Sequence, residues 1–333
     1  MLATIGFCEL VFMFAAYVVL DGYDFGVGTI APFVTTSAEE RGALLAAIGP
    51  FWNGNEVWLI AAGGVLFAFF PDAYAVSFSG FYLPFIIVLW LFMLRGVAIE
   101  LREQIDSEVW RTLWDAVFTI ASALLAVMFG VALGNLIRGV GLKGSGFFFG
   151  TFYALLNPFA AGTGVFALLA LAMHGAVFAA MSLQGALAER CAAFARRLWW
   201  LVLLLFVGMT VAAFGIDRGM VGQPLLSAAL TLASLVALIA VFRSTGRAAF
   251  QASSTFLALL ICTAAATLFP YLIPSYPRGH GGLTIYAATA GTSTPALATM
   301  IALVAVALGA LLIYRALIAA HLGRSTVTVP PVH

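Results

Sequence analysis

Two short polar runs interrupt an otherwise apolar sequence, and their residues are the candidates for chemistry. Asp21 and Asp24 belong to the first run, and Trp52, Asn53 and Glu56 belong to the second. The two aspartates stand three positions apart, as do Asn53 and Glu56, so each pair shares one face of a helix. A buried carboxyl group can take up a proton and pass it on, and an amide can hold water. We therefore interpret the two runs as candidates for a proton path.

Structural roles are an alternative for the same residues. Asn53 and Glu56 can join neighbouring helices through hydrogen bonds, a role as common for polar groups in membrane spans as proton transfer. By position alone, Asp21 and Asp24 are expected at the inner membrane edge, where hydrated charges are inexpensive. Pro50 removes a backbone hydrogen bond and predicts a kink just before the second run. The sequence leaves both interpretations open for the two pairs.

Three further ionisable residues are predicted at or near membrane depth. Glu9 lies alone in the middle of the first apolar segment, and Asp115 opens the fourth. His174 lies inside the fifth, and it raises the question of haem because axial haem ligands in helical bundles are usually His or Met. Because no second histidine is expected at membrane depth, a polar contact between helices is the favoured interpretation of His174.

The composition is that of a membrane protein. Hydrophobic residues make up 63% of the 333 residues and charged residues 9%, whereas soluble domains have roughly 45 to 50% and 25%. A net charge of +1 predicts no basic face for a nucleic acid. The three cysteines, Cys8, Cys191 and Cys262, are too far apart to predict a disulfide framework or a cysteine metal site.

Apolar segments predict an all-α integral membrane protein with about nine transmembrane helices. They cover residues 1–20, 43–70, 73–94, 113–136, 151–181, 198–214, 223–242, 252–270 and 294–318. The first segment contains no Lys or Arg, so we interpret it as a retained helix rather than a cleaved signal peptide. Because the connections are short, residues 1–324 are predicted to form a single polytopic membrane domain, and residues 325–333 a short C-terminal tail.

The basic residues predict the orientation of the chain in the membrane. Most of them fall in loops on one side, and Arg95, Arg102 and Arg111 are all assigned to one such loop, 95–112. The loops of the opposite side hold the remaining four: Arg138, Lys143, Arg218 and Arg278. Because Lys and Arg are enriched in cytoplasmic loops, the N-terminus is predicted outside and the C-terminus in the cytoplasm.

Six short runs follow one another along most of the chain: Leu20–Gly28, Trp52–Leu59, Phe78–Tyr82, Gly134–Leu136, Leu156–Phe159 and Leu268–Ser275. Together they resemble subunit II of cytochrome bd-type quinol oxidases, and they occur in the order that this family shows. Each run alone is weak evidence, but six runs in order are specific.

The resemblance implies a subunit of a respiratory terminal oxidase in the bacterial cytoplasmic (inner) membrane. In that family, subunit II forms two four-helix bundles plus one helix and pairs with a haem-bearing subunit I. Subunit I ligates haem b and haem d and oxidises quinol, so the active site is expected in the partner. Subunit II is expected to stabilise subunit I and to contribute to proton uptake from the cytoplasm. A small single-span subunit, a structural quinone and membrane lipid are further possible partners that the sequence does not place.

The resemblance also assigns roles to individual residues. Asp21 and Asp24 match the acidic pair of the first family motif, and Trp52 matches the tryptophan of the second. The sequence departs from the family directly after that tryptophan, because Asn53 stands where well-known members have Asp. Glu56, where some members have Gln, lies on the same helical face. We hypothesise that Glu56 supplies the missing carboxyl group.

Two other classes of protein remain as alternatives. An ion-coupled secondary transporter would also have many spans and buried carboxylates, but paired broken helices in two halves would be typical of it, and the strongly broken polar helix has no twin in this sequence. The other alternative is a structural scaffold of a membrane complex, in which none of the carboxylates matters to turnover.

Overall fold

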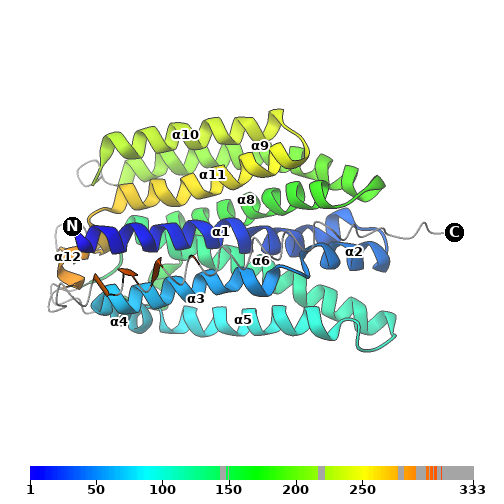
Figure 1. Ribbon diagram of the computed structural model, residues 1–333, viewed down its shortest axis with the longest axis horizontal. Helices are drawn as coiled ribbons and strands as arrows, with labels where there is room; N and C mark the ends of the chain where they lie inside the picture. Colours follow the sequence, from blue (N-terminus) through cyan, green and yellow to red (C-terminus); the bar gives the residue numbers. More distant parts are fainter. Residues whose placement is uncertain are drawn as a thin grey trace.

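The structure of the chain is a computed structural model that describes residues 1–142, 148, 150–216, 222–276, 281–289, 298–299, 301–302, 304–305 and 309. Helices run side by side along one long axis, and the N-terminus lies at one end of it (Figure 1). The predicted ninth span, 294–318, lies mostly outside the described residues, and the predicted tail 325–333 lies wholly outside them.

Helices make up most of the described chain. The first half contains α1 (Leu2–Val34), α2 (Ala38–Ile48), α3 (Trp52–Phe69), α4 (Pro71–Gly80), α5 (Tyr82–Leu101) and α6 (Glu108–Arg138). The second half contains α7 (Phe152–Leu155), α8 (Pro158–Ser182), α9 (Gly185–Ile216), α10 (Pro224–Arg243) and α11 (Gly246–Leu268). Two short strands, β1 (Tyr271–Pro274) and β2 (Gly282–Thr284), and a last turn of helix, α12 (Ile285–Ala288), follow.

Seven of the described helices are long and apolar enough to cross a membrane, namely α1, α5, α6, α8, α9, α10 and α11. This confirms the prediction of an all-helical membrane protein with many spans. With 33 residues in α1 and 31 in α6, these two helices reach about 45 to 50 Å at 1.5 Å per residue. Both are longer than the bilayer core of about 30 Å, so their ends project beyond it.

The predicted boundaries of the first three spans were wrong. The first span does not end at residue 20, because α1 continues through Asp21 and Asp24 to Val34. The second and third spans, 43–70 and 73–94, are each divided between two helices. Polar residues lower the mean hydropathy of a window whether or not a helix ends there. Hydropathy therefore predicts poorly where helices end and where a span is divided between two helices.

Pro50 lies at the break between α2 and α3. The predicted kink is a complete interruption, because α2 ends at Ile48 and α3 begins at Trp52. The amide of Phe51 donates to the carbonyl oxygen of Ile48 at 2.9 Å, which closes a tight turn around the proline. The break starts a new helix at Trp52, so the second polar run occupies the first turns of α3.

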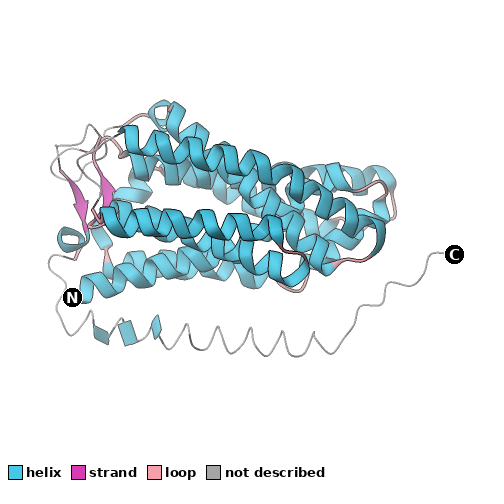
Figure 2. Ribbon diagram, turned by 90° about the horizontal axis from the view of Figure 1, so that it is seen from above, coloured by secondary structure: helices cyan, strands magenta, loops and turns pink. Residues whose placement is uncertain are grey.

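Helix α1 lies at the centre of the described helices. It packs against α3, α6, α8 and α11, with α3 and α5 to one side and α9, α10 and α11 to the other (Figure 1). Strands β1 and β2 are antiparallel, with Tyr271 opposite Thr284, and they lie at the end of the bundle that holds the N-terminus (Figure 2). Asp21 and Asp24 of α1 are fully buried and therefore face other helices of the same chain.

Candidate functional site

Arg95 is the residue around which the carboxylates gather. It lies on α5 with its side chain fully buried, and its Nη2 atom is 2.8 Å from Oδ1 of Asp21 and 3.8 Å from Oδ2 of Asp24 on α1. Its Nη1 atom is 3.1 Å from Oε1 of Glu56 on α3. The structure thus brings three of the predicted site residues together around one guanidinium group. The ring of Phe25 covers that group, with 4.5 Å from its centroid to Cζ of Arg95.

The environment of the two aspartates differs from the expected one. The side chains of Asp21 and Asp24 are 0% exposed, so the prediction of a hydrated position at the membrane edge was wrong. Both lie well inside α1 and face α3 and α5. Arg95, assigned above to an inner loop, is the reason, because a buried cation lets two carboxylates remain in the helix interior.

Glu56 differs from the aspartates because its side chain is 25% exposed on the surface of the chain. It connects the buried cluster with the outside of α3. Three carboxyl groups around one cation carry an excess of negative charge when all are ionised, and such an arrangement favours the binding of a proton. The cluster, defined as Asp21, Asp24, Glu56 and Arg95, can therefore exchange protons between its interior and the surface at Glu56.

Asn55 is the amide that faces the cluster. Its side chain is fully buried, and Nδ2 lies 2.9 Å from the carbonyl oxygen of Leu20, 2.8 Å from the hydroxyl of Tyr23 and 2.6 Å from Oδ2 of Asp24. Asn53, the amide predicted to share a face with Glu56, is exposed instead. The structure therefore adds Asn55 to the candidate site, and the role of Asn53 in a proton path stays a prediction.

The other residue of the second run lies beside the cluster without joining it. Trp52 is half-buried at the start of α3. A Cβ atom on Gly96 of α5 would lie 3.7 Å from the indole ring of Trp52, so this ring packs against the helix that carries Arg95. Trp52 thus shields one flank of α3 and α5. Among the described residues, the contact of its ring with α5 is a packing contact.

Asn55 and Arg95 each belong to a buried stripe of their helix. Along α3 the buried residues are Asn55, Trp58, Ala62, Val65 and Phe69, spaced by three or four positions. Along α5 the buried residues are Leu91, Arg95 and Ala98, with the same spacing. Each polar residue continues a buried apolar stripe of its helix. The burial of each stripe follows from helix packing and cannot be read from the sequence, because Val57, Ile60 and Phe67 form an apolar but exposed stripe on the side of Asn53.

His174 on α8 has protein partners at both ring nitrogens. Nε2 is 3.0 Å from the carbonyl oxygen of Val19, and Nδ1 is 2.8 Å from the hydroxyl of Ser253. A carbonyl oxygen only accepts, so Nε2 carries the hydrogen, and the hydroxyl of Ser253 lies within hydrogen-bond distance of both Nδ1 and the carbonyl oxygen of Phe250. The ring also stacks on Phe250 with 5.1 Å between centroids. These contacts join α8 with α1 and α11, as the interpretation of a polar contact between helices predicts, and leave no nitrogen for a haem iron.

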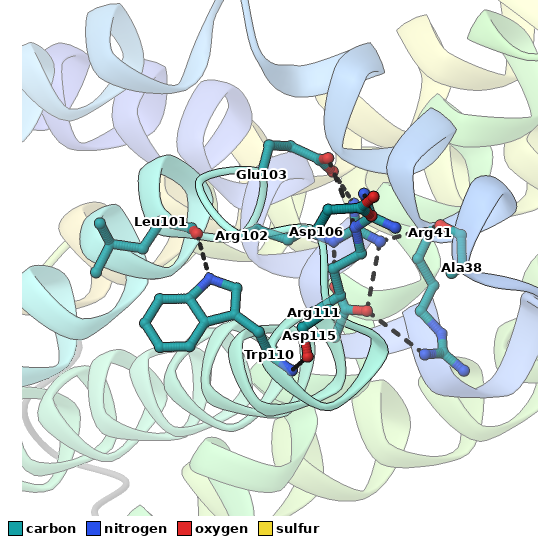
Figure 3. Close-up of polar contacts among 10 residues, drawn as sticks. Ala38, Arg41, Leu101, Arg102, Glu103, Asp106, Trp110, Arg111 and Asp115 are labelled. Carbon is teal, nitrogen blue, oxygen red and sulfur yellow. Dashed lines mark hydrogen bonds and ion pairs between the residues drawn. The ribbon is translucent and has the colours of Figure 1, made fainter.

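A second ionic network lies where α2, α5 and α6 meet (Figure 3). Arg102, at the end of α5, contacts Oδ1 of Asp115 at 2.6 Å and donates to the carbonyl oxygen of Ala38 at 3.0 Å. Arg41 contacts Oδ2 of Asp115 at 3.4 Å. Partial burial alone would lower the pKa of Arg102, but the hydrogen bond and charge of Asp115 outweigh it and raise that pKa. The network holds α2, α5 and α6 together where these three helices meet.

Glu9, the remaining predicted candidate, stays apart from both networks. It lies twelve positions before Asp21 on α1, which is about 18 Å along the helix at 1.5 Å per residue. Asp115 belongs to the network at the end of α6 and not to the cluster around Arg95. The cluster around Arg95 and the network of Asp115 are therefore separate, and Glu9 belongs to neither.

Comparison with known proteins gives a consistent result. The chain matches the family model described as cytochrome bd terminal oxidase subunit II over residues 2–319. It is 33% identical to the cytochrome bd-I ubiquinol oxidase subunit 2 of Escherichia coli K12, covering 87% of this chain and 86% of the relative. It is 30% identical to the cytochrome bd ubiquinol oxidase subunit 2 of Bacillus subtilis, covering 84% of each chain.

A solved structure shows the same fold. A chain of the bd oxidase from Geobacillus thermodenitrificans superimposes with a TM-score of 0.78 and covers 97% of this chain and 99% of that one. The two sequences are 18% identical, so this likeness concerns the fold alone. It extends over nearly the whole length of both chains.

Proposed function

The chain belongs to the cytochrome bd terminal oxidase subunit II family, and we propose that its buried carboxylate cluster takes up protons from the cytoplasm for oxygen reduction in that complex. Membership makes the chain a multi-pass protein of the bacterial inner membrane and a subunit of a respiratory oxidoreductase. The transporter alternative loses its support, because the relatives are oxidase subunits.

In the proposed complex, the partner subunit I ligates haem b and haem d and holds the active site. The contacts of His174 support this, because both of its ring nitrogens are engaged within the chain. The names of the relatives support quinol as the substrate of the complex. This chain then stabilises subunit I and supplies part of the proton path. A small single-span subunit and a structural quinone remain predictions.

The proposed topology has nine spans, with the ninth at 294–318, the N-terminus outside and the C-terminus in the cytoplasm. The two bundles plus one helix are part of the same proposal. Arg102 directly follows α5, and Arg190 lies in the first two turns of α9. Both support the orientation, because these ends of α5 and α9 lie at the end of the bundle opposite the N-terminus (Figure 1). The end that holds Arg41, Arg102 and Arg190 is therefore taken as the cytoplasmic end.

The geometry of the cluster is the observation that carries the proton proposal. Asp21 and Asp24 are enclosed, Glu56 reaches the surface, and Arg95 bridges them within 3.8 Å. We expect protons to enter at the aspartates and to leave through Glu56 toward subunit I. Glu56 thereby takes the role of the family carboxyl group that is missing at Asn53, whose side chain is exposed and cannot ionise.

Oxygen consumption of the complete oxidase tests this proposal. The complex carrying Glu56→Gln, Asn53→Ala or neither is reconstituted in liposomes, and quinol-driven oxygen consumption and proton uptake are recorded. Glu56→Gln is expected to lower both by at least about tenfold, because positioned acid–base groups contribute roughly 10² to 10⁴ in rate. Asn53→Ala is expected to change little. The haem difference spectrum of each preparation verifies that the complex has assembled.

Equal losses in the two variants, or a negligible loss with Glu56→Gln, would contradict the proposed role of Glu56. Asp21→Asn then decides whether the cluster as a whole takes part. If Asp21→Asn also leaves oxygen consumption and proton uptake unchanged, the chain acts as a scaffold for subunit I and the proton proposal fails.

A further inference from the structure

Helices α9, α10 and α11 carry positive charge that their own carboxylates do not balance. They contain five arginines and a single carboxylate, that of Glu189. Arg190 pairs with Glu40 of α2. The other four arginines are exposed and take part in none of the ion pairs among the described residues. They are Arg196, Arg197, Arg243 and Arg247. An excess of positive charge on one part of a surface attracts an anionic partner.

Trp199 shows that the arginines of α9 and α10 lie at one level of the bundle. Its Nε1 atom donates to the carbonyl oxygen of Leu238 at 2.7 Å, and its ring centroid is 4.7 Å from that of Phe242. Arg196 precedes Trp199 by three positions, and Arg243 follows Phe242 directly. Because α9 begins and α10 ends at the same end of the bundle (Figure 1), both arginines lie on the same side of this contact.

The arginines of α9 lie on the side of that helix and not in a loop. Helix α9 begins at Gly185, eleven positions before Arg196, so its start extends about 16 Å beyond Arg196 at 1.5 Å per residue. Figure 1 shows the same step, because α8 and the start of α9 reach further from the N-terminal end than the turn between α10 and α11. Arg247, the second residue of α11, adds its charge directly after this turn.

An exposed apolar stripe continues from Arg196 along α9. Its residues follow Arg196 at spacings of four, four, three and four positions, so they share one face of the helix. They are Trp200, Leu204, Val207 and Val211, with exposed fractions from 48 to 69%. The ring centroid of Trp200 is 5.8 Å from that of Phe242 on α10. The stripe therefore lies on the side of α9 that is next to α10.

A second exposed apolar stripe continues from Arg243 along α10. Going back from Arg243, its residues follow at spacings of four, three and four positions. They are Ile239, Val236 and Leu232. Both stripes run from the level of the arginines toward the end of the bundle that holds the N-terminus (Figure 1). Two apolar tracks thus lie on neighbouring helices, and each begins at an exposed arginine.

We propose that this surface binds one anionic glycerophospholipid, with its phosphate between Arg196 and Arg243 and its two acyl chains along the two stripes. A guanidinium group matches a phosphate through two parallel hydrogen bonds. Arg197 and Arg247 add positive charge around the headgroup. The indole ring of Trp200 lies where aromatic rings are favoured, between the headgroups and the hydrocarbon. The bound lipid joins α9 with the pair α10 and α11.

A protein is the competing occupant of this surface, either the partner subunit I or a second copy of this chain. The observations favour a phospholipid, because a charged group, an aromatic level and a long apolar track follow one another in this order along α9. A phospholipid has the same order in its headgroup, glycerol region and acyl chains. Basic residues needed only for orientation can lie in any cytoplasmic loop, whereas Arg196 and Arg197 lie within a helix beside the apolar tracks.

Phospholipid titration of the complete, delipidated oxidase in a non-ionic detergent tests the proposal. Phosphatidylglycerol and phosphatidylethanolamine with the same acyl chains are added separately, and the unfolding midpoint is recorded at each concentration. A ligand that binds the native state raises the midpoint. We expect phosphatidylglycerol to reach half of its full shift at a lower concentration than phosphatidylethanolamine, because the net charge of its headgroup is negative.

Arginine variants show whether these side chains hold the headgroup. One arginine contributes to the binding of an anionic lipid surface by about fivefold in affinity. Arg243→Gln should therefore raise the concentration of phosphatidylglycerol at half shift about fivefold, and Arg196→Gln together with Arg243→Gln roughly 25-fold. Arg111→Gln is the control with the same change of charge, because Arg111 lies on α6 and pairs with Asp106 at 3.1 Å. It should leave that concentration unchanged.

Native mass spectrometry of the same complexes counts the subunits and the phospholipids that each retains. One anionic phospholipid fewer in the double variant, with all subunits present, supports the site. Equal affinities for the two phospholipids, or equal effects of Arg243→Gln and Arg111→Gln, overturn it. Loss of subunit I or of a second copy from the Arg243→Gln complex, with the lipid count unchanged, overturns it as well and assigns the surface to that protein.

This inference goes beyond the proposed function and does not depend on it. Neither the midpoints nor the lipid counts involve turnover, so a failure of the proton proposal leaves both measurements unaffected. Normal oxygen consumption and proton uptake in a complex that has lost the lipid would keep the site and the proton path as separate properties of the chain.

Discussion

Arg95 of α5 and Asp21 of α1 form an ion pair of 2.8 Å in which both side chains are completely buried. The two residues are 74 positions apart in the chain, so the pair joins helices that local sequence does not connect. A charge at the centre of a span costs at least about 2.5 to 3.5 kcal/mol on insertion scales. Each residue of the pair therefore lowers the free-energy cost of burying the charge of the other at membrane depth.

Arg95→Leu is expected to destabilise the chain strongly. The variant leaves Asp21 and Asp24 buried without their cation, and breaking a buried ion pair costs about 3 to 5 kcal/mol. The thermal unfolding midpoint of the purified complex measures the effect. Arg95→Lys should be intermediate, because one ammonium group cannot reproduce both the Nη1 contact with Glu56 and the Nη2 contact with Asp21.

The double variant Asp21→Asn with Arg95→Leu is the control for this prediction. Because it removes both members of the pair, it should be less destabilised than the sum of the two single variants. A midpoint for Arg95→Leu equal to that of the unmodified complex would show that the pair contributes nothing to stability.

Asn55→Asp is expected to reduce both assembly and turnover. Asn55 Nδ2 is 2.6 Å from Oδ2 of Asp24, and a second carboxyl at that position would replace a donor by a like charge. Asn55→Ser, which keeps a hydroxyl donor, should be milder. Oxygen consumption per mole of haem checks the order of the two variants. If the Asn55→Asp complex consumed oxygen as fast as the Asn55→Ser complex, this result would contradict the donor role of Asn55.

Hydropathy predicts which parts of this chain are helical in the membrane, but it predicts the ends of helices poorly. Asp21 and Asp24 lower the hydropathy of α1 without ending it, because their compensating charge comes from Arg95 on another helix. Pro50 acts within its own segment, so a disturbance of the helix at this position could be predicted from the sequence. Contacts between distant helices are outside the reach of any sequence window.

The candidate site was predicted only in part, because contacts between distant helices cannot be read from the sequence. Asp21, Asp24 and Glu56 meet around Arg95, whereas Asn53 faces outward and Asn55 faces inward. Three positions of spacing place two side chains on one face, but they do not tell which face is buried. The apolar residues of α3 do not tell either, because Val57, Ile60 and Phe67 follow Asn53 at helical spacing just as Trp58, Ala62 and Val65 follow Asn55.

Gly26→Ala and Gly175→Ala are expected to separate α1 from α8. A Cβ atom on Gly26 would lie 2.1 Å from the carbonyl oxygen of Leu171, and one on Gly175 would lie 2.3 Å from the carbonyl carbon of Gly26. These are backbone atoms that cannot turn away, so overpacking should cost at least about 1 to 3 kcal/mol. The unfolding midpoint and the yield of assembled complex measure the loss.

Gly208→Ala in α9 is the matched control. A Cβ atom there would meet nothing within 4 Å in the chain, and alanine is favoured over glycine within helices by about 0.5 to 1 kcal/mol. Its midpoint should stay the same or rise slightly. If Gly26→Ala were as harmless as Gly208→Ala, the two helices would not be in backbone contact.

Glu40→Gln is expected to lower stability at neutral pH but not in acid. Partial burial would raise the pKa of Glu40, but hydrogen bonds from Thr36 and the ion pair with Arg190 outweigh it and lower the pKa. A carboxyl whose pKa is lowered by folding stabilises the protein above its unfolded pKa, and this stabilisation is lost as pH falls through the folded pKa. The pair is partly exposed, so the effect is about 0.2 to 1 kcal/mol.

Unfolding midpoints of the Glu40→Gln and unmodified complexes, measured from neutral pH down to acid pH, check this prediction. The two unfolding midpoints should converge as the pH falls and Glu40 is protonated. Arg190→Gln should reduce the difference at neutral pH, because Arg190 supplies part of the shift. A difference that stays constant over the whole pH range would exclude ionisation of Glu40 as its cause.

His174→Phe is expected to leave the haem content of the oxidase unchanged. Both ring nitrogens already have partners, Val19 at 3.0 Å and Ser253 at 2.8 Å, and Phe preserves the stacking on Phe250. The variant removes the hydrogen bonds of His174 with Val19 and Ser253, while the hydroxyl of Ser253 keeps the carbonyl oxygen of Phe250 as an acceptor at 2.9 Å. At about 0.5 to 1.5 kcal/mol for each hydrogen bond, a loss of about 1 to 3 kcal/mol in stability is expected. The reduced-minus-oxidised spectrum, normalised to the protein of the assembled complex, measures the haem. Loss of a haem band at unchanged assembly would identify His174 as a ligand, whereas a lower midpoint with full haem content establishes that it joins α8 to α1 and α11.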